Sequence, residues 1–236
     1  MITLYGMTSP NVVKVIIALE ELGLPYELKT VDVFTGQQFD PAFVKLNPNA
    51  KVPVITDSDG PGGKPYTLFE SGAILLYLAD KTGKLLSKEM GPRYDAIQWL
   101  MVQLTGVGPM FGQFVHFFRF AAQGNDYSVS RYRTQVKRLC DVIEARLGQT
   151  PYVGGADYSI ADIATFPWVR NIKTFLGEGA SAYPKIIAWV EKIEKRPAVG
   201  RAITKVEKMR ETLTPFDKAA PELLDKVFGR GQHAAA

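Results

Sequence analysis

The chain has little cysteine, little histidine and no long hydrophobic run. Cys140 is its only cysteine, which excludes an intrachain disulfide and any CxxC redox or zinc motif. The two histidines, His116 and His233, are too isolated to form a metal site or a catalytic triad. No apolar run approaches the ~18 residues of a membrane span, and the first residues lack the charged and apolar regions of a signal peptide. We therefore expect a cytoplasmic protein with no membrane partner and no metal. Thiol chemistry must then use an external thiol or Cys140 itself.

Charge of one sign is also not concentrated anywhere. The net charge of the 236 residues is +4, but Lys and Arg are spread along the chain rather than grouped. A nucleic acid partner is therefore not indicated. The weak positive balance suits a small anionic ligand. The share of apolar residues, 46%, is ordinary for a globular protein and allows a sizeable core.

The first part of the chain alternates between β-prone and helical patterns. Asn11 is a plausible N-cap for the first helix, and Gly23 closes it. The predicted order is strand, helix, strand, short helix, two strands and helix, which defines an α/β unit over residues 1–83. The expected elements are strand 2–5, helix 12–22, strand 26–33, helix 41–46, strands 54–55 and 67–69, and helix 70–82.

The strand signal disappears from about residue 89 onward. Helical spacing predicts a second, all-helical domain over residues 93–213, joined by a linker at 84–92. Ser159 followed by Asp162 is a capping-box signal at one helix start. We expect the C-terminal tail, residues 214–236, to be frayed. The predicted helices span 93–105, 127–147, 160–175, 184–195 and 200–211.

Two short motifs in the first unit indicate a binding site. Pro53 stands at the head of the apolar run Val54-Ile55, where its bond to Val52 can be cis. A cis bond would turn the backbone of Val52 outward, free to pair with an extended peptide. Glu70-Ser71 follows a predicted strand and opens a helix, whose N-terminus favours an anionic group. The alternative is a strand start followed by an ordinary helix cap.

The combination of motifs resembles one family. The chain is similar to the nu-class branch of the cytosolic glutathione transferases, which includes bacterial disulfide-bond oxidoreductases, over roughly residues 1 to 205. The resemblance implies a thioredoxin-like α/β N-terminal domain that binds glutathione and an all-α C-terminal domain. The motifs that carry it are Pro10-Asn11, Gly36-Gln37-Gln38-Phe39, the run from Asn47 to Pro53, the run from Leu68 to Ala79, Gln98-Trp99-Leu100, Gly108-Pro109-Met110 and the run from Tyr158 to Ala164.

The resemblance also implies a role for individual residues. Glutathione would serve as co-substrate, in a homodimer, with the cysteinyl backbone on Val52 beside a cis Pro53. Glu70 would face the γ-glutamyl ammonium, and Ser71 its carboxylate. The remaining expected contacts are Gln38 and Lys51 at the glycyl end, Gln98 on the γ-glutamyl side and Arg131 from the partner subunit. The plainer alternative is that Lys51, Arg131 and Gln98 are ordinary surface residues.

The reaction depends on ionising a thiol, whose pKa is about 8.5 when free. The dipole of the helix that begins near Asn11 contributes about 0.3–1 kcal/mol, less than one pKa unit. A hydrogen bond to the charged sulfur is worth about 1.5–3 kcal/mol, so donors must supply most of the activation. Thr8, Ser9 and Asn11 lie in the right loop. The family pattern has a threonine where this chain has Ser9, so either Ser9 or Thr8 can be the donor.

Other ways of activating a thiol fit the sequence less well. Residues 7–11 contain no cysteine, and Tyr5 falls inside a predicted strand, where packing is expected. Cys140 lies in an apolar stripe of a predicted helix, which indicates a core residue. We therefore predict a glutathione-dependent thiol-disulfide oxidoreductase that reduces small disulfides, binds glutathione or glutathione disulfide, and uses no protein cysteine.

Two other functions stay open. The first is a transferase or peroxidase that acts on hydrophobic electrophiles or organic hydroperoxides, which an apolar second pocket would favour. The residues available for such a pocket are Phe111, Phe114, Phe117 and Phe118, although they can equally be core. The second is a non-catalytic glutathione-binding module. The presence of Ser9, Asn11 and Glu70-Ser71 argues against that module.

Overall fold

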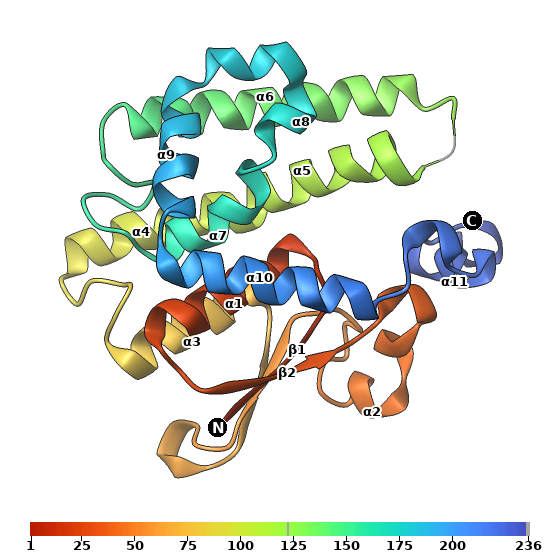
Figure 1. Cartoon of the computed structure of the whole chain (residues 1–236), viewed down its shortest axis with the longest axis horizontal. Coiled ribbons are helices and arrows are strands. Elements are labelled where there is room, and N and C mark those ends of the chain that lie inside the picture. The colour runs from red at the N-terminus through yellow and green to blue at the C-terminus, as the bar shows by residue number, and fades with distance from the viewer. Residues whose placement is uncertain (122, 235–236) are drawn as a thin grey trace. The chain divides into compact units, whose positions relative to one another are not determined.

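The computed structural model of the protein describes residues 1–121 and 123–234. These residues group into two units, one formed by Met1–Ile74 with the chain from Gly200 onward, the other by Leu75–Val199. Helices α3 (Ser71–Thr82) and α10 (Pro197–Thr212) each continue from one unit into the other (Figure 1). The domain limits predicted at residues 83, 93 and 213 remain predictions.

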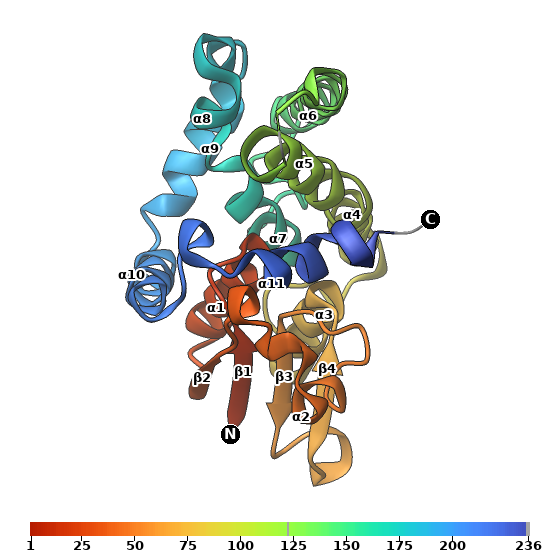
Figure 2. The ribbon, with the colours of Figure 1, turned by 90° about the vertical axis from the view of Figure 1, so that its right-hand side faces the viewer.

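The first unit is built on a four-stranded mixed sheet with the strand order β2-β1-β3-β4 (Figure 2). Strands β1 and β2 are parallel, as expected for two strands joined by a helix, and the other pairs are antiparallel. The strands are β1 (Ile2–Gly6), β2 (Tyr26–Thr30), β3 (Val54–Asp57) and β4 (Tyr66–Phe69). The predicted thioredoxin-like α/β arrangement is confirmed.

The two faces of the sheet are covered by different elements. Ile2 and Leu4 are buried on the face where α1 (Pro10–Leu22) packs, and a side chain at Gly6 would collide with Val12 of that helix. The opposite face carries Val54, which packs with Phe43 of α2 (Pro41–Val44). Alternation of side chains along each strand explains both layers.

Helix α1 begins two residues earlier than the sequence suggested. Its N-cap is Ser9, and Pro10 takes the first helical position, where its fixed φ fits and its missing N–H costs nothing. Asn11 is therefore inside the first turn, and its prediction as N-cap is wrong. Gly23 ends the helix at φ 65°, as predicted.

The loops of the first unit contain short helical segments. The segment between β2 and α2 forms two 3₁₀ turns, η1 (Val33–Thr35) and η2 (Gln37–Phe39), and η3 (Pro61–Gly63) lies between β3 and β4. The tail is not frayed over its described residues, so that prediction is wrong. It contains η7 (Phe216–Lys218), α11 (Pro221–Phe228) and η8 (Gly231–His233). Pro221 at the first position and Gly229 in the left-handed region after the end are ordinary helix limits.

The second unit is helical, as predicted, and its described residues form no β-strand of the sheet. The predicted helix 160–175 is divided at Arg170–Asn171, shortly after Pro167, which removes one helical donor. Two π-helical turns flank α5. The elements are α4 (Met90–Val102), η4 (Gln103–Val107), α5 (Gly108–Val115), η5 (His116–Phe120), α6 (Asp126–Leu147), α7 (Ile160–Val169), α8 (Ile172–Leu176), η6 (Gly177–Ala182) and α9 (Pro184–Glu194).

A buried carboxyl group organises the start of α7. Asp162 accepts hydrogen bonds from the backbone N–H of Val153 at 2.7 Å and from Nε1 of Trp189 at 3.0 Å. Its other oxygen accepts from the backbone N–H of Ser159 at 3.1 Å, and the hydroxyl of Ser159 accepts in turn from the N–H of Ala161. The predicted capping box is confirmed, and Asp162 also ties α7 to α9.

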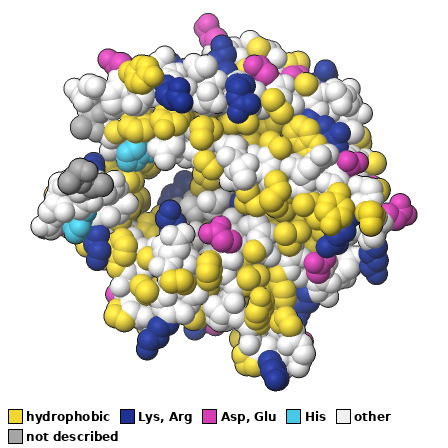
Figure 3. All heavy atoms as spheres, turned by 180° about the vertical axis from the view of Figure 1, so that it is seen from behind, with side chains coloured by type: hydrophobic (Ala, Val, Ile, Leu, Met, Phe, Trp, Pro, Cys, Tyr) yellow, Lys and Arg dark blue, Asp and Glu magenta, His cyan; other side chains and the backbone are white. Residues whose placement is uncertain are grey.

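Surface charges are scattered rather than grouped in the space-filling view, with hydrophobic side chains between them (Figure 3). Several large hydrophobic side chains of α4 and α6 are exposed, Met90 and Tyr127 most of all. Among the helices formed by the described residues, none has the length and apolar character that a membrane crossing requires.

Candidate functional site

The predicted site motifs meet at one small cavity of the first unit. Its volume is about 70 Å³, below the roughly 300–1,000 Å³ of typical ligand pockets, so it can take an end group or a short stretch of backbone. The lining residues are Asn11, Asn47, Lys51, Val52, Pro53, Glu70 and Ser71. All of them except Asn47 are residues that the sequence predicted for the site.

The loop before β3 shapes one wall of this cavity. Asn47 is buried, its Nδ2 donates to the carbonyl of Lys51 at 2.6 Å, and its Oδ1 accepts from the N–H of Asn49 at 2.9 Å. The Val52-Pro53 bond that follows is cis, as the resemblance implied. In the sequence, Asn47 was part of the run that carries the family resemblance, but it was not predicted as a site residue. The Asn-Pro-Asn run was a usable signal, because Asn side chains commonly bond the backbone two residues on.

Glu70 and Ser71 also line the cavity. Glu70 is exposed and has a φ of 67°, although it is not glycine. Its carbonyl accepts from the N–H of Ile74 at 2.9 Å, so Glu70 caps α3, and Ser71 is the buried first residue of that helix. A side chain in the left-handed region costs about 1 kcal/mol or more. The local fold thus keeps the backbone of Glu70 in an unusual conformation, with its carboxylate side chain at the cavity.

The charge of Glu70 also acts on a buried lysine of α1. Lys14 follows Asn11 by three residues on α1, and its side chain is completely buried. Burial lowers the pKa of Lys14 to about 7, opposed by the attraction of the Glu70 carboxylate. No sequence signal distinguished Lys14 from the surface lysines, because only the tertiary packing buries it.

The first turn of α1 carries a polar group with no partner. The carbonyl of Ser9 accepts from the N–H groups of Val12 and Val13, both at 3.0 Å. Its hydroxyl oxygen is buried, makes no capping bond, and has no other hydrogen-bond partner. Thr8 and Asn11 are half-buried, and neither Thr8 nor Ser9 lines the cavity. Tyr5 packs edge-on against Phe43, as predicted, at a ring distance of 6.4 Å.

The other predicted contacts do not line this cavity. Gln38 is buried, its Nε2 donates to the carbonyl of Val33 at 3.3 Å, and its Oε1 has no partner. Gln98 and Arg131 belong to the second unit, where both are exposed. Gln98 donates to Asp95 at 3.2 Å within α4. The structure therefore brings together the residues near Val52 and Glu70, but not the whole predicted set.

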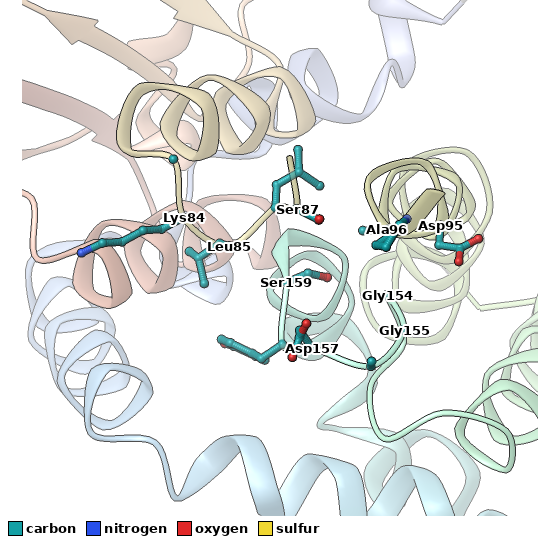
Figure 4. A pocket seen from close by; sticks show the side chains of 14 residues that line it. Lys84, Leu85, Ser87, Asp95, Ala96, Gly154, Gly155, Asp157 and Ser159 are labelled. Atoms are coloured by element: carbon teal, nitrogen blue, oxygen red, sulfur yellow. The ribbon is translucent and has the colours of Figure 1, made fainter. Parts of the chain in front are cut away.

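A larger cavity, of about 390 Å³, lies in the second unit between the loops at 83–87 and 154–159 and the first turns of α4 (Figure 4). Its polar side chains, among them Lys84, Asp95 and Asp157, are of mixed charge. None of the predicted site residues lines it. Size alone favours this cavity, but the chemistry favours the smaller one, where a helix start, a carboxylate and a cation converge.

Cys140 is not part of either cavity. It is buried in α6, and burial, with smaller effects of Asp141 and Glu144, raises the pKa of its thiol to about 12. The thiol is therefore protonated at neutral pH and is not a nucleophile. Phe111 and Phe114 are fully buried as well and pack edge-on against Phe175, so they belong to the core of the second unit. Within the described part of the chain, no group of three or more His, Cys, Asp or Glu could hold a metal ion.

The fold and the site together define a protein with a thioredoxin-like unit and a helical unit. Comparison with family models identifies it further: the glutathione S-transferase N-terminal domain matches residues 8–81 and the C-terminal domain matches residues 126–192. The chain belongs to the glutathione S-transferase family.

Individual relatives agree with this assignment. The chain is 47% identical to the disulfide-bond oxidoreductase YfcG of Escherichia coli over 208 residues, 88% of this chain and 96% of that protein. It is 48% identical to a glutathione transferase family member of Pseudomonas fluorescens, solved with two glutathione molecules bound, with a TM-score of 0.82 over 86% of this chain and 92% of that one. A glutathione transferase of Pseudomonas putida, with one glutathione disulfide bound per subunit, is 42% identical with a TM-score of 0.82 over 86% and 90%.

Proposed function

We propose that the protein is a glutathione-dependent thiol-disulfide oxidoreductase that reduces small disulfides without a cysteine of its own. The observation that carries the proposal is the buried hydroxyl of Ser9, which stands at the start of α1 with no partner. A buried donor without a partner costs about 1–3 kcal/mol, so a ligand atom that accepts its hydrogen bond would be stabilised there. A thiolate is such an acceptor. The names of the relatives support the same reading.

Backbone and charged groups of the first unit would hold glutathione. Val52 would pair with the cysteinyl backbone beside Pro53, and the Glu70 carboxylate would bind the γ-glutamyl ammonium. Ser71, at the start of α3, would bind the γ-glutamyl carboxylate, where the helix N-terminus favours negative charge. The glycyl end would meet Lys51 and Gln38, whose unpartnered Oε1 can accept an N–H. Gln98 would reach the γ-glutamyl side.

The sulfur would lie near the start of α1. Ser9 would donate its hydroxyl to the thiolate, with Asn11 and Thr8 as further donors. The thiolate would attack one sulfur of a disulfide, so that a mixed disulfide with glutathione forms and one thiol leaves. A second glutathione would attack the mixed disulfide through its thiolate, which yields glutathione disulfide and the second thiol. Two glutathione molecules are oxidised and one disulfide is reduced, and no protein group changes its redox state.

Turnover of 2-hydroxyethyl disulfide with glutathione, coupled to glutathione reductase, tests the proposal. Cys140→Ala is expected to keep the activity, whereas Ser9→Ala is expected to lower kcat/KM by about 10- to 100-fold, the value of a hydrogen bond to a charged group. Thr8→Ala and Asn11→Ala measure the share of the other two donors. Activity that disappears with Cys140 in a folded protein would overturn the mechanism.

The same assays separate the alternatives. Burial of Phe111 and Phe114 removes two of the four side chains that could have formed an apolar second pocket. Conjugation of an aromatic electrophile or reduction of cumene hydroperoxide at a higher rate than disulfide reduction would favour a transferase or a peroxidase. Binding of glutathione with no turnover of any substrate would favour a non-catalytic module.

We also propose that the chain is a nu-class enzyme that works as a cytoplasmic homodimer. The exposed hydrophobic side chains of α4 and α6, with Met90 77% and Tyr127 79% exposed, support an interface on the second unit. In a dimer, Arg131 of α6 would serve the site of the partner subunit. Sedimentation equilibrium tests the dimer. A heterodimer of an Arg131→Ala subunit with a Ser9→Ala subunit tests whether Arg131 acts across the interface.

A further inference from the structure

The tail of the chain packs against the loop that carries Gln38. Both segments belong to the first unit, where α11 contacts η1 (Figure 1). The backbone N–H of Thr214 donates to Oδ2 of Asp32 at 2.8 Å, at the point where the tail leaves α10. This bond fastens the beginning of the tail to the residue that precedes η1.

Aromatic and aliphatic contacts continue along the tail. The Phe216 ring meets Phe34 of η1 edge-on at 5.9 Å and Phe228 of α11 at 6.2 Å. Leu223 lies directly against Gly36, since a Cβ atom at Gly36 would be only 3.2 Å from Cδ2 of Leu223. Lys226 places its ammonium 4.1 Å from the centre of the Phe39 ring in η2. The tail therefore touches the loop at its start, middle and end.

The residue that anchors the tail also organises the loop. Oδ1 of Asp32 accepts from the N–H of Phe34 at 3.1 Å, and the N–H of Asp32 donates to Oε1 of Gln37 at 2.8 Å. The side chain of Gln38 is bound in turn to the carbonyl of Val33 in η1. A continuous set of hydrogen bonds and contacts thus joins the tail to Gln38.

We propose that residues 214–228 form a strap that positions Gln38 for the glycyl end of glutathione, with Phe216 and Leu223 as positioning residues. The inference rests on the proposed function, because that function gives Gln38 its ligand. The Nε2 of the buried Gln38 donates one hydrogen bond, to the carbonyl of Val33, and its buried Oε1 has no hydrogen-bond partner. A loop that is already ordered by contacts with the tail loses less conformational entropy when the ligand binds. The strap therefore lowers the entropic cost of binding the glycyl end of glutathione.

The test measures KM and kcat for glutathione in the disulfide assay, together with hydrogen exchange of the amides at residues 33–39. The double variant Phe216→Ala/Leu223→Ala is expected to raise KM about 3- to 10-fold, the worth of one neutral hydrogen bond, while kcat changes by less than about twofold. Exchange at 33–39 is expected to become faster. Gln38→Ala is expected to raise KM equally, and adding the double variant to it is expected to change KM no further.

Three controls make the result specific. Phe216→Tyr keeps the ring and is expected to restore the wild-type KM, and Lys218→Ala, exposed on η7, is expected to change nothing. A stop after Leu213 is expected to reproduce the double variant. An effect on KM that adds fully to that of Gln38→Ala, or faster exchange without any change in KM, would overturn the strap. Wild-type protein that neither binds nor turns over glutathione would instead overturn the proposed function, whatever the exchange result.

Discussion

The carboxylate of Glu70, exposed where it lines the small cavity, acts electrostatically on Lys14, which is completely buried in α1. A lysine without access to water is rare in a folded protein. Its burial disfavours the charged form, while the Glu70 carboxylate favours it. The protonation of Lys14 is therefore linked both to folding and to the charge at the cavity.

The stability of the protein is expected to rise as the pH rises from 7 to 8. The pKa of Lys14 is about 7 in the folded state and 10.5 as the ordinary value, so over this range the unfolded chain binds more protons than the folded one. The free energy of unfolding should increase by about 1 kcal/mol, close to the 1.36 kcal/mol per pH unit of one proton. Urea unfolding of the wild type and Lys14→Met at both pH values measures it. Equal pH dependence in the two proteins would refute the linkage.

Glu70→Gln is expected to raise the KM for glutathione by about 10- to 100-fold, because a charge-assisted hydrogen bond to the γ-glutamyl ammonium is lost. The backbone at Glu70 should keep its conformation, since glutamine has the same shape. The matched control is Glu27→Gln, an exposed glutamate on β2, which should leave KM unchanged. A KM within twofold of the wild type in Glu70→Gln would remove Glu70 from the site.

A second carboxylate of the first unit serves stability. Glu20 is only 9% exposed and bonds Arg201 at 2.7 Å and Lys205 at 2.6 Å, both on α10. Tyr26 also donates its hydroxyl to Glu20, at 2.9 Å. Burial raises the pKa of Glu20, but hydrogen bonds from Lys205, Arg201 and Tyr26 outweigh it, so the pKa is lowered.

Because the folded pKa of Glu20 is below the unfolded value, its contribution to stability is complete above pH 4.5 and is lost as the pH falls further. Glu20→Gln is expected to lower the free energy of unfolding by about 1–2 kcal/mol at pH 7, a modest value because both cations are half-exposed. Thermal unfolding at pH 7 and pH 3.5 checks this. The difference between variant and wild type should shrink at the lower pH, and a constant difference would speak against the ion pair.

Asp162 is expected to be among the most sensitive positions of the second unit. Asp162→Ala leaves the N–H groups of Val153 and Ser159 and the indole of Trp189 without an acceptor. The expected loss is about 3 kcal/mol or more, against about 1 kcal/mol for the cap alone in Ser159→Ala. Asp157→Ala, exposed nearby, is the control. Equal small losses in all three proteins would show that Asp162 is no more than a surface cap.

Most of the fold was predictable, because its elements depend on local signals. Alternating and helical hydrophobic patterns predicted the strands and helices of the first unit, and Ser159 with Asp162 indicated the start of α7. The errors arose where two signals compete. Asn11 and Ser9 are both residue types that cap helices well. Ser9 is the N-cap because Pro10, which follows it, prefers the first helical position. For α11, Pro221 and Gly229 were present, but the place of this segment at the end of the chain suggested fraying.

The candidate site was predictable only in part. Its motifs are local in the sequence, whereas the residues around them come from distant parts of the chain. Val52-Pro53 and Glu70-Ser71 stand out in the sequence, since proline and a helix start restrict the backbone directly. The charge of Glu70 acts on Lys14, and Phe216 packs on Phe34 from more than a hundred residues away in the chain. No pattern in the sequence relates such partners, because tertiary packing alone brings them together.

The most direct test of the proposed mechanism is the pKa of the glutathione thiol when glutathione is bound to the Cys140→Ala protein. In this variant the bound glutathione carries the only thiol, so ultraviolet absorbance of the thiolate can be followed against pH. The proposed mechanism predicts that the pKa of the bound thiol is lowered by about one to two units from the free value of about 8.5, and that it returns toward that value in Cys140→Ala/Ser9→Ala. A bound thiol that titrates like free glutathione, or one that Ser9→Ala leaves unchanged, would contradict it.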